Sequence, residues 1–225
     1  MERNFFERFR FIIFFCTLLI TSGINLTGAK LNPGIDIGYY NGPGFSLYIT
    51  SDSIPSKKTA GRFSLGISFP YPGNPSLARK VFINDATNGI PHGKGRSYNF
   101  GFDLIKNLRL KIYPKSKFFF GIRYSMFRAM FKYTGGNEEF TITSNNFGIG
   151  VGTDYYFKLT RKRSLRISTG IDYFFRARIH GHDTTYYPDN QNINPRRSYG
   201  FSDADSSVNQ PNIEFKIVFG LTAKK

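Results

Sequence analysis

The chain has 225 residues, and aromatic residues make up 17% of it. A formal net charge of +16 makes nucleic acid the first partner to consider. The sequence contains one cysteine, which excludes a disulfide framework within the chain. The length suits one domain or two small ones.

The first 29 residues have the pattern of a secretory signal peptide. Three arginines precede the apolar run FIIFFCTLLI, and Thr27 and Ala29 occupy the positions before an expected cleavage site. The run is too short to cross a bilayer as a helix, and a buried N-terminal helix is the alternative. Cys16 lies inside this segment, so we expect a mature chain without thiol chemistry. Export also argues against nucleic acid as a partner.

From residue 34 onward, apolar and polar side chains alternate with a period of two, which predicts β-strands with one apolar face. The turn sequence NGPG separates the first two strands. We predict eight strands, at 34–40, 45–50, 61–69, 97–113, 117–133, 145–157, 163–183 and 211–223.

Connections of two kinds separate these strands. The short ones include 53–58, 114–117 and 158–163, whereas 70–96 and 184–210 are long and rich in Pro, Asn and Gly. Short and long connections at opposite ends are typical of an antiparallel up-and-down barrel.

Two barrels fit this alternation. A lipocalin-like soluble barrel turns its apolar face inward around a ligand, whereas an outer-membrane barrel turns it outward into lipid. The polar face here consists mainly of Gly, Ser, Asn, Asp and Arg, and the apolar face carries many Phe, Ile and Leu side chains. Small residues suit the interior of a narrow eight-stranded barrel. We therefore expect the apolar face to point into a membrane.

With this pattern, residues 30–223 resemble the OmpA/OmpX-like superfamily, the small eight-stranded outer-membrane barrels of Gram-negative bacteria. The resemblance implies a signal peptide at 1–29 and, at 30–225, an all-β, eight-stranded antiparallel up-and-down transmembrane β-barrel in the cell outer membrane. The family's last strand usually finishes on Phe or Trp. Here Phe219 and Leu221 are followed by TAKK, which departs from that pattern.

Alternate residues of a strand point to opposite faces, and this parity directs a set of ionisable residues into the barrel lumen. Buried ions must be paired, so we expect a ladder such as Arg123 or Arg166 with Asp154 or Asp172. This network would plug the lumen, and an ion pathway is the alternative. The inward-facing set is Asp36, Arg62, Asp103, Arg109, Lys111, Arg123, Asp154, Arg166, Asp172, Arg176, Arg178, Glu214 and Lys216.

Basic residues gather in the short turns, which the family's orientation assigns to the periplasmic side. This basic rim could attract anionic lipid headgroups or be merely solvated. Arg128 and Lys132 lie toward the opposite end, on the same strand face as the apolar side chains. There they could meet lipopolysaccharide phosphates, or extend their long side chains toward water. The rim comprises Lys115, Lys117, Lys158, Arg161, Lys162 and Arg163.

Few residues indicate chemistry. His180 and His182 share a strand face near Asp183, a spacing that can bind Zn or Cu, but ordinary residues at the barrel rim are the simpler interpretation. A lipid A-modifying barrel enzyme would carry its catalytic Ser and His on the outer rim, whereas the alternation of this strand turns both histidines into the lumen. We therefore expect no catalytic residues, no cofactor and no metal.

The functional prediction is a monomeric barrel with a structural or adhesive role. Its partners would be outer-membrane lipids, with lipopolysaccharide or cell-surface ligands on the long loops. Aromatic and arginine side chains in 184–210, such as Tyr186, Arg196 and Tyr199, could anchor a ligand. The alternative functions are a narrow pore or conduit for small or hydrophobic molecules and a lipid A-modifying enzyme.

Overall fold

The computed structural model describes residues 31–56, 59–74, 92–108, 116–132, 139–161, 163–182, 199–201 and 210–223. All of them belong to one unit, Leu31–Lys225. The expected signal peptide lies outside the described residues.

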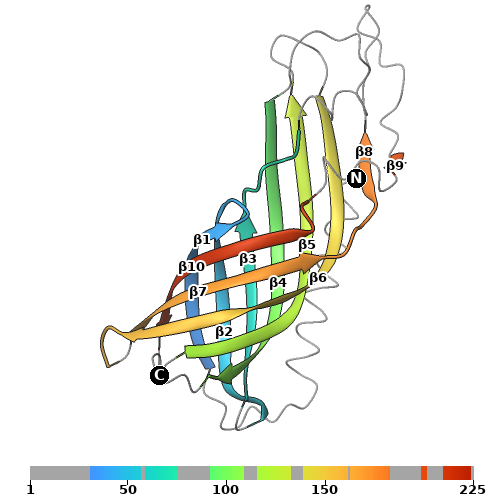
Figure 1. Ribbon diagram of the computed structural model, residues 1–225. Coiled ribbons are helices and arrows are strands. Elements are labelled where there is room, and N and C mark those ends of the chain that lie inside the picture. The colour runs from blue at the N-terminus through green and yellow to red at the C-terminus, as the bar shows by residue number, and fades with distance from the viewer. Residues whose placement is uncertain are drawn as a thin grey trace, which may run out of the picture. The chain divides into compact units, whose positions relative to one another are not determined.

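Within the described residues, ten strands form one antiparallel sheet, and eight of them close into a barrel (Figure 1). The order is β5-β4-β3-β2-β1-β10-β7-β6, and pairing of β5 with β6 completes the ring. The predicted all-β, eight-stranded antiparallel barrel is confirmed. The strands are β1 (Leu31–Tyr40), β2 (Pro43–Ser56), β3 (Thr59–Ser68), β4 (His92–Asn107), β5 (Ser116–Lys132), β6 (Glu139–Lys158), β7 (Arg163–Phe174), β8 (Ile179–His182), β9 (Tyr199–Phe201) and β10 (Ile213–Ala223).

Chain connectivity fixes the pairing of neighbours. The turn between β1 and β2 contains Asn41 and Gly42, and Asn41 has a φ of 56°. Asparagine tolerates this left-handed conformation better than most residues do. The last strand, β10, lies between β1 and β7, so the two ends of the sequence of barrel strands meet side by side.

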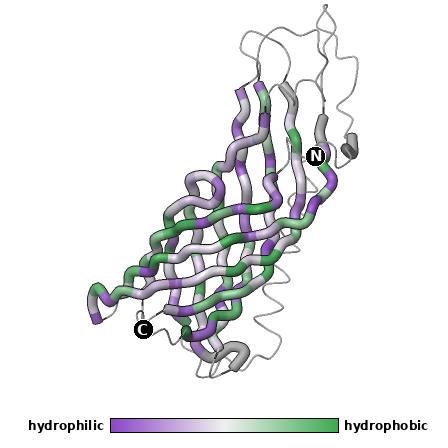
Figure 2. Tube along the Cα trace, in the orientation of Figure 1, coloured by the Kyte–Doolittle hydropathy of each residue, from purple (hydrophilic) through white to green (hydrophobic). Residues whose placement is uncertain are grey.

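Burial alternates along the strands as the sequence pattern predicts. On β5, the side chains of Phe118, Phe120 and Ile122 are exposed on the outside, whereas Phe119 and Arg123 are buried. The other barrel strands likewise expose large apolar side chains and bury polar ones. Hydrophobic and hydrophilic positions alternate along the tube in Figure 2. Apolar side chains therefore cover the exterior, whereas the interior holds mostly polar side chains together with some apolar ones such as Phe119.

Three strands continue past the others at the end that carries the long connections. The last pair between β3 and β4 is Ser68 with Ser97, whereas β4 and β5 stay paired up to His92 and Lys132. The upper parts of β4, β5 and β6 therefore form a projecting wall (Figure 1). The predicted loop 70–96 is consequently too long, because 92–96 belongs to β4.

The strand predicted at 163–183 is interrupted. Pairing with β6 stops at Gly148 opposite Phe174 and resumes at Thr143 opposite His180. Four residues of β6 thus face five residues at 175–179, and this extra residue is a β-bulge. A shift of one residue moves every later side chain to the other face.

The interruption corrects the sequence predictions for four residues. Ile179, predicted to point outward, is buried with 2% of its surface exposed, whereas His180, predicted to face the lumen, is exposed. Arg176 and Arg178 are also exposed, in the irregular segment between β7 and β8. Neither arginine therefore belongs to the interior set.

Candidate functional site: an ionic network in the barrel lumen

The lumen holds eight charged side chains joined in one chain of ion pairs with alternating sign. Four bases balance four acids. Seven of the eight barrel strands contribute, and Ser46 on the remaining strand, β2, donates a hydrogen bond to Asp36 at 3.4 Å. In order, the members are Lys216, Asp172, Arg123, Asp103, Arg62, Asp154, Arg166 and Asp36.

Arg62 lies at the centre of this network. It donates from Nε and Nη2 to Oδ2 of Asp103, at 3.0 and 2.8 Å, and from Nη1 to Oδ2 of Asp154 at 2.6 Å. Asp103 also pairs through Oδ1 with Nη2 of Arg123 at 2.7 Å. Since Arg62, Asp103 and Asp154 are all buried, each charge depends on the others for its stabilisation.

The two ends of the chain lie on β10 and β1. Lys216 donates to both carboxylate oxygens of Asp172 at 2.9 Å, and Arg123 donates from Nε to Oδ1 of Asp172 at 2.8 Å. At the other end, Arg166 pairs with Asp36, and its Nη1 lies 3.4 Å from Asp154.

Aromatic rings fill the space beside these charges. The guanidinium of Arg62 and the ammonium of Lys216 each lie 4.9 Å from the centre of the Phe119 ring. The guanidinium of Arg166 lies 4.2 Å from the Tyr48 ring centre, within cation–π range. The Tyr48 hydroxyl is hydrogen-bonded to Thr222 at 2.6 Å. Ionic and aromatic groups together occupy the middle of the lumen.

Glycines make room for the network. A Cβ atom on Gly150 would meet the carboxylate of Asp172 and the guanidinium of Arg123, and one on Gly220 would meet Asp36. A Cβ on Gly121 would likewise meet Asp103. Larger residues at these positions would displace the charged side chains from their partners.

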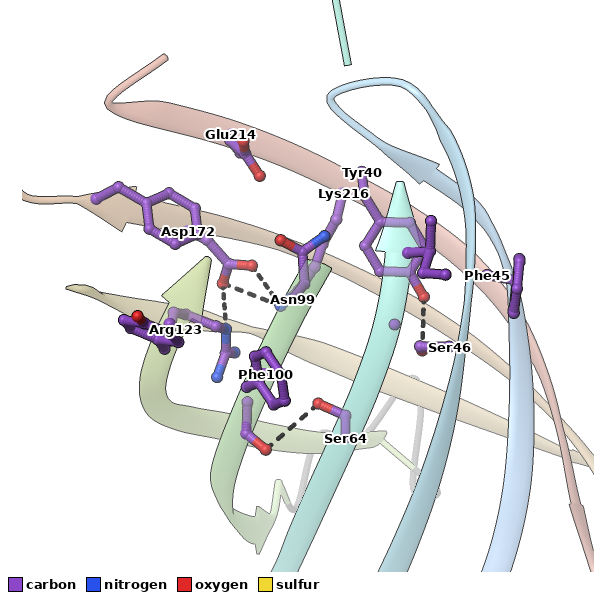
Figure 3. Close-up of a pocket in the computed structure, with 15 residues that line it drawn as sticks. Tyr40, Phe45, Ser46, Ser64, Asn99, Phe100, Arg123, Asp172, Glu214 and Lys216 are labelled. Atoms are coloured by element: carbon purple, nitrogen blue, oxygen red, sulfur yellow. Dashed lines mark hydrogen bonds and ion pairs between the residues drawn. The ribbon is translucent and has the colours of Figure 1, made fainter. Parts of the chain in front are cut away.

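Glu214 is a fifth buried acid, outside the alternating chain. Its Oε1 accepts a hydrogen bond of 2.8 Å from Gln210, and Gln210 in turn accepts one of 3.0 Å from Asn146. Glu214 lines a small cavity with Tyr40 and Lys216, shown in Figure 3. The cavity has room of about 50 Å³ for water-sized molecules, enough for a few waters.

The structure places the predicted interior residues as follows. Two suggested pairs, Arg123 with Asp172 and Arg166 with Asp154, are both present. Asp36, Arg62, Asp103, Glu214 and Lys216 also point inward. Arg109 and Lys111 lie outside the described residues. Phe119 was not among the predicted interior residues, although the alternation of β5 places it on the same inward face as Arg123.

Part of the predicted basic rim falls within the described residues. Lys158, Arg161 and Arg163 are exposed. Lys117 is half-buried, and its ammonium lies 5.1 Å from the centre of the Tyr156 ring. Lys115 and Lys162 lie outside the described residues.

The described segments were also compared with the requirements of a membrane-spanning helix and of a metal site. Among these segments, none is a helix long and apolar enough to span a membrane. The same segments contain no cluster of three or more His, Cys, Asp or Glu residues suited to holding a metal ion.

Comparison of the whole fold with solved structures finds a clear likeness. The chain shares its fold with a major outer membrane protein from Thermus thermophilus. The TM-score is 0.69 at 19% sequence identity, over 88% of this chain and 99% of that one. Neisserial surface protein A aligns over 88% of this chain and 97% of its own, at 14% identity and a TM-score of 0.41. No protein-family model and no curated protein sequence matches the chain.

Proposed function

We propose that this chain is an integral outer-membrane barrel whose exterior faces lipid. The supporting observation is the inverted pattern of burial. Large apolar side chains lie exposed on every barrel strand, whereas the ions are inside. Water would penalise that exterior, but lipid acyl chains solvate it favourably. Examples from successive strands are Ile37, Leu47, Leu65, Phe102, Ile122, Phe147, Ile171 and Phe215.

The lumen of the proposed membrane barrel is closed by the ionic network. Arg62 pairs with Asp103 on the neighbouring strand and Arg166 with Asp154 on its own neighbour. The pair of Arg62 with Asp154 joins β3 to β6, which are not neighbours, and Phe119 packs beside Arg62. An eight-stranded barrel has an interior that side chains can fill completely. The network thus acts as a structural plug, and the barrel serves a structural or surface-contact role rather than conduction.

Conductance measurements test the plug. Purified protein is added to planar bilayers, with a general porin as the positive control and detergent as the blank. We expect no single-channel steps in 1 M KCl, because the bore is filled by paired side chains. Reproducible steps from the purified protein would support the alternative, a narrow pore.

The surface-contact role is assigned to the long-loop end of the barrel. Replacing 184–198 with a short Gly-Ser linker leaves all eight barrel strands intact. We expect cells that display this variant to lose adhesion to surfaces coated with candidate cell-surface ligands, at equal barrel abundance. Equal adhesion by the variant and the original chain would contradict an adhesive role of this loop.

A further inference from the structure

The outer face of the projecting wall is basic where the lower barrel is apolar. Side chains of His92, Lys94 and Arg96 on β4 and Arg128 and Lys132 on β5 are exposed. Hydrophilic positions gather at the upper ends of these strands in Figure 2. Because β4 and β5 pair in continuous register over this stretch, these cations share the outward face of the lipid-facing side chains below them.

Arg96 with Arg128 is the pair in this group nearest to the apolar exterior below. They are direct cross-strand partners, which places their Cβ atoms about 4.5–5.5 Å apart on one face. Like charges in this arrangement repel each other. On its other side Arg128 pairs with Thr143, which carries no charge. Within the described residues, none of the ion pairs includes either guanidinium.

The height of this pair matches that of lipid headgroups. The next outward positions down the two strands are Tyr98 and Met126, about 6.6 Å below. From there the apolar exterior continues through Phe102, Phe120 and Ile122. The guanidinium of Arg96 also lies 5.9 Å from the centre of the exposed Phe69 ring. Two exposed cations thus lie directly above the proposed acyl-chain boundary.

We propose that Arg96 and Arg128 together bind an anionic, phosphate-bearing lipid headgroup in the leaflet that surrounds the long-loop end. This inference rests on the proposed membrane orientation of the apolar exterior. Phosphate oxygens accept hydrogen bonds from guanidinium groups in a two-pronged geometry. A bound phosphate would relieve the repulsion between the two arginines, and Lys94, one outward position farther up β4, adds a third positive charge.

Lipid binding by defined variants tests this site. The protein is placed in phosphatidylcholine nanodiscs with increasing amounts of phosphatidic acid, or of diacylglycerol with the same acyl chains. Bound lipid is counted by native mass spectrometry, and thermal stability is measured in parallel. We expect saturable binding of phosphatidic acid and none of diacylglycerol. Binding should be roughly tenfold weaker in Arg128→Gln, because this variant loses one charge-assisted hydrogen bond. The double variant Arg96→Gln/Arg128→Gln should lose saturable binding.

Stability without acidic lipid gives a second readout. Arg128→Gln removes the repulsion, so it should melt at a higher temperature than the original chain in pure phosphatidylcholine, yet gain less from phosphatidic acid. If Arg128 had only a structural role, Arg128→Gln would shift the melting temperature in phosphatidylcholine and the gain from phosphatidic acid in the same direction. Lys106→Gln is the matched control, because Lys106 is an exposed cation on β4, the strand of Arg96, and on the same outward face, opposite Phe118. Its lipid response should remain unchanged.

Three outcomes would overturn the lipid site. These are equal phosphatidic acid binding by the original chain and the double variant, an equal response to diacylglycerol, and binding of inorganic phosphate as tight as that of phosphatidic acid. The last result would indicate a site for soluble anions instead. Failure of the protein to enter nanodiscs would contradict the proposed membrane orientation itself, so the two failures are distinguishable.

Discussion

Asp103 connects two guanidinium groups inside the barrel and is the clearest single-residue test of the network. Asp103→Asn keeps the shape of the side chain but removes the charge that pairs with Arg62 and Arg123. We expect the free energy of unfolding to fall by about 3–5 kcal/mol, the usual cost of removing one partner from buried ion pairs. Urea unfolding in lipid vesicles measures the change.

Asp52→Asn is the matched control for that experiment. Asp52 accepts a hydrogen bond from Asn32 at 3.0 Å, but it is exposed near the turn end of β2. Its substitution should change the free energy of unfolding by less than about 1 kcal/mol. Equal effects of the two substitutions would show that the lumen network adds no special stability.

At the scale of single residues, the sequence was most informative about charge. Parity alone directed Asp36, Arg62, Asp103 and Asp154 to the interior, because an ion on an otherwise small and polar strand face has few other places to lie. It left the choice of partners open, offering Arg123 or Arg166 with Asp154 or Asp172. Which carboxylate faces Arg62 depends on the stagger of β3, β4 and β6, and this is a property of the closed barrel.

The interruption between β7 and β8 is the element that parity could not predict. Cysteine labelling tests it in a background without Cys16. His180→Cys should react with a membrane-impermeant maleimide, whereas Ile179→Cys should be protected, because the bulge turns Ile179 inward. Thr143→Cys, on the outward face opposite His180, is the positive control. Labelling of Ile179→Cys with protection of His180→Cys would indicate an uninterrupted strand.

Strand ends show a similar limit of sequence patterns. The sequence predicts a long strand starting at Ser97, whereas β4 begins at His92. The alternation weakens above Ser97 because Gly93 and Gly95 carry no side chain. The structure gives the reason for these glycines: a Cβ on Gly95 would meet the backbone of Pro70, and one on Gly93 would meet the ring of Pro72. A distant segment therefore accounts for the two glycines that interrupt the alternation.

For the molecule as a whole, the decisive question is which solvent surrounds the exterior. Ile122 lies midway along the apolar outer face of β5, with 64% of its surface exposed. If that face meets lipid, Ile122→Arg should lower the free energy of unfolding by about 2–4 kcal/mol in vesicles. Ile122→Leu is the conservative control. A change within about 0.5 kcal/mol, typical of exposed positions in water, would contradict a lipid-facing exterior.

The sequence by itself determined the class of fold and the direction of the two faces. A period of two, small residues on one face and bulky apolar residues on the other are local properties, and they suffice to predict an inside-out barrel. Only the tertiary structure decided the ion-pair partners, the inward bulge at 175–179 and the juxtaposition of Arg96 with Arg128. These features depend on register between strands that are distant in sequence. One extra residue shifts that register and moves every later side chain to the other face of the sheet.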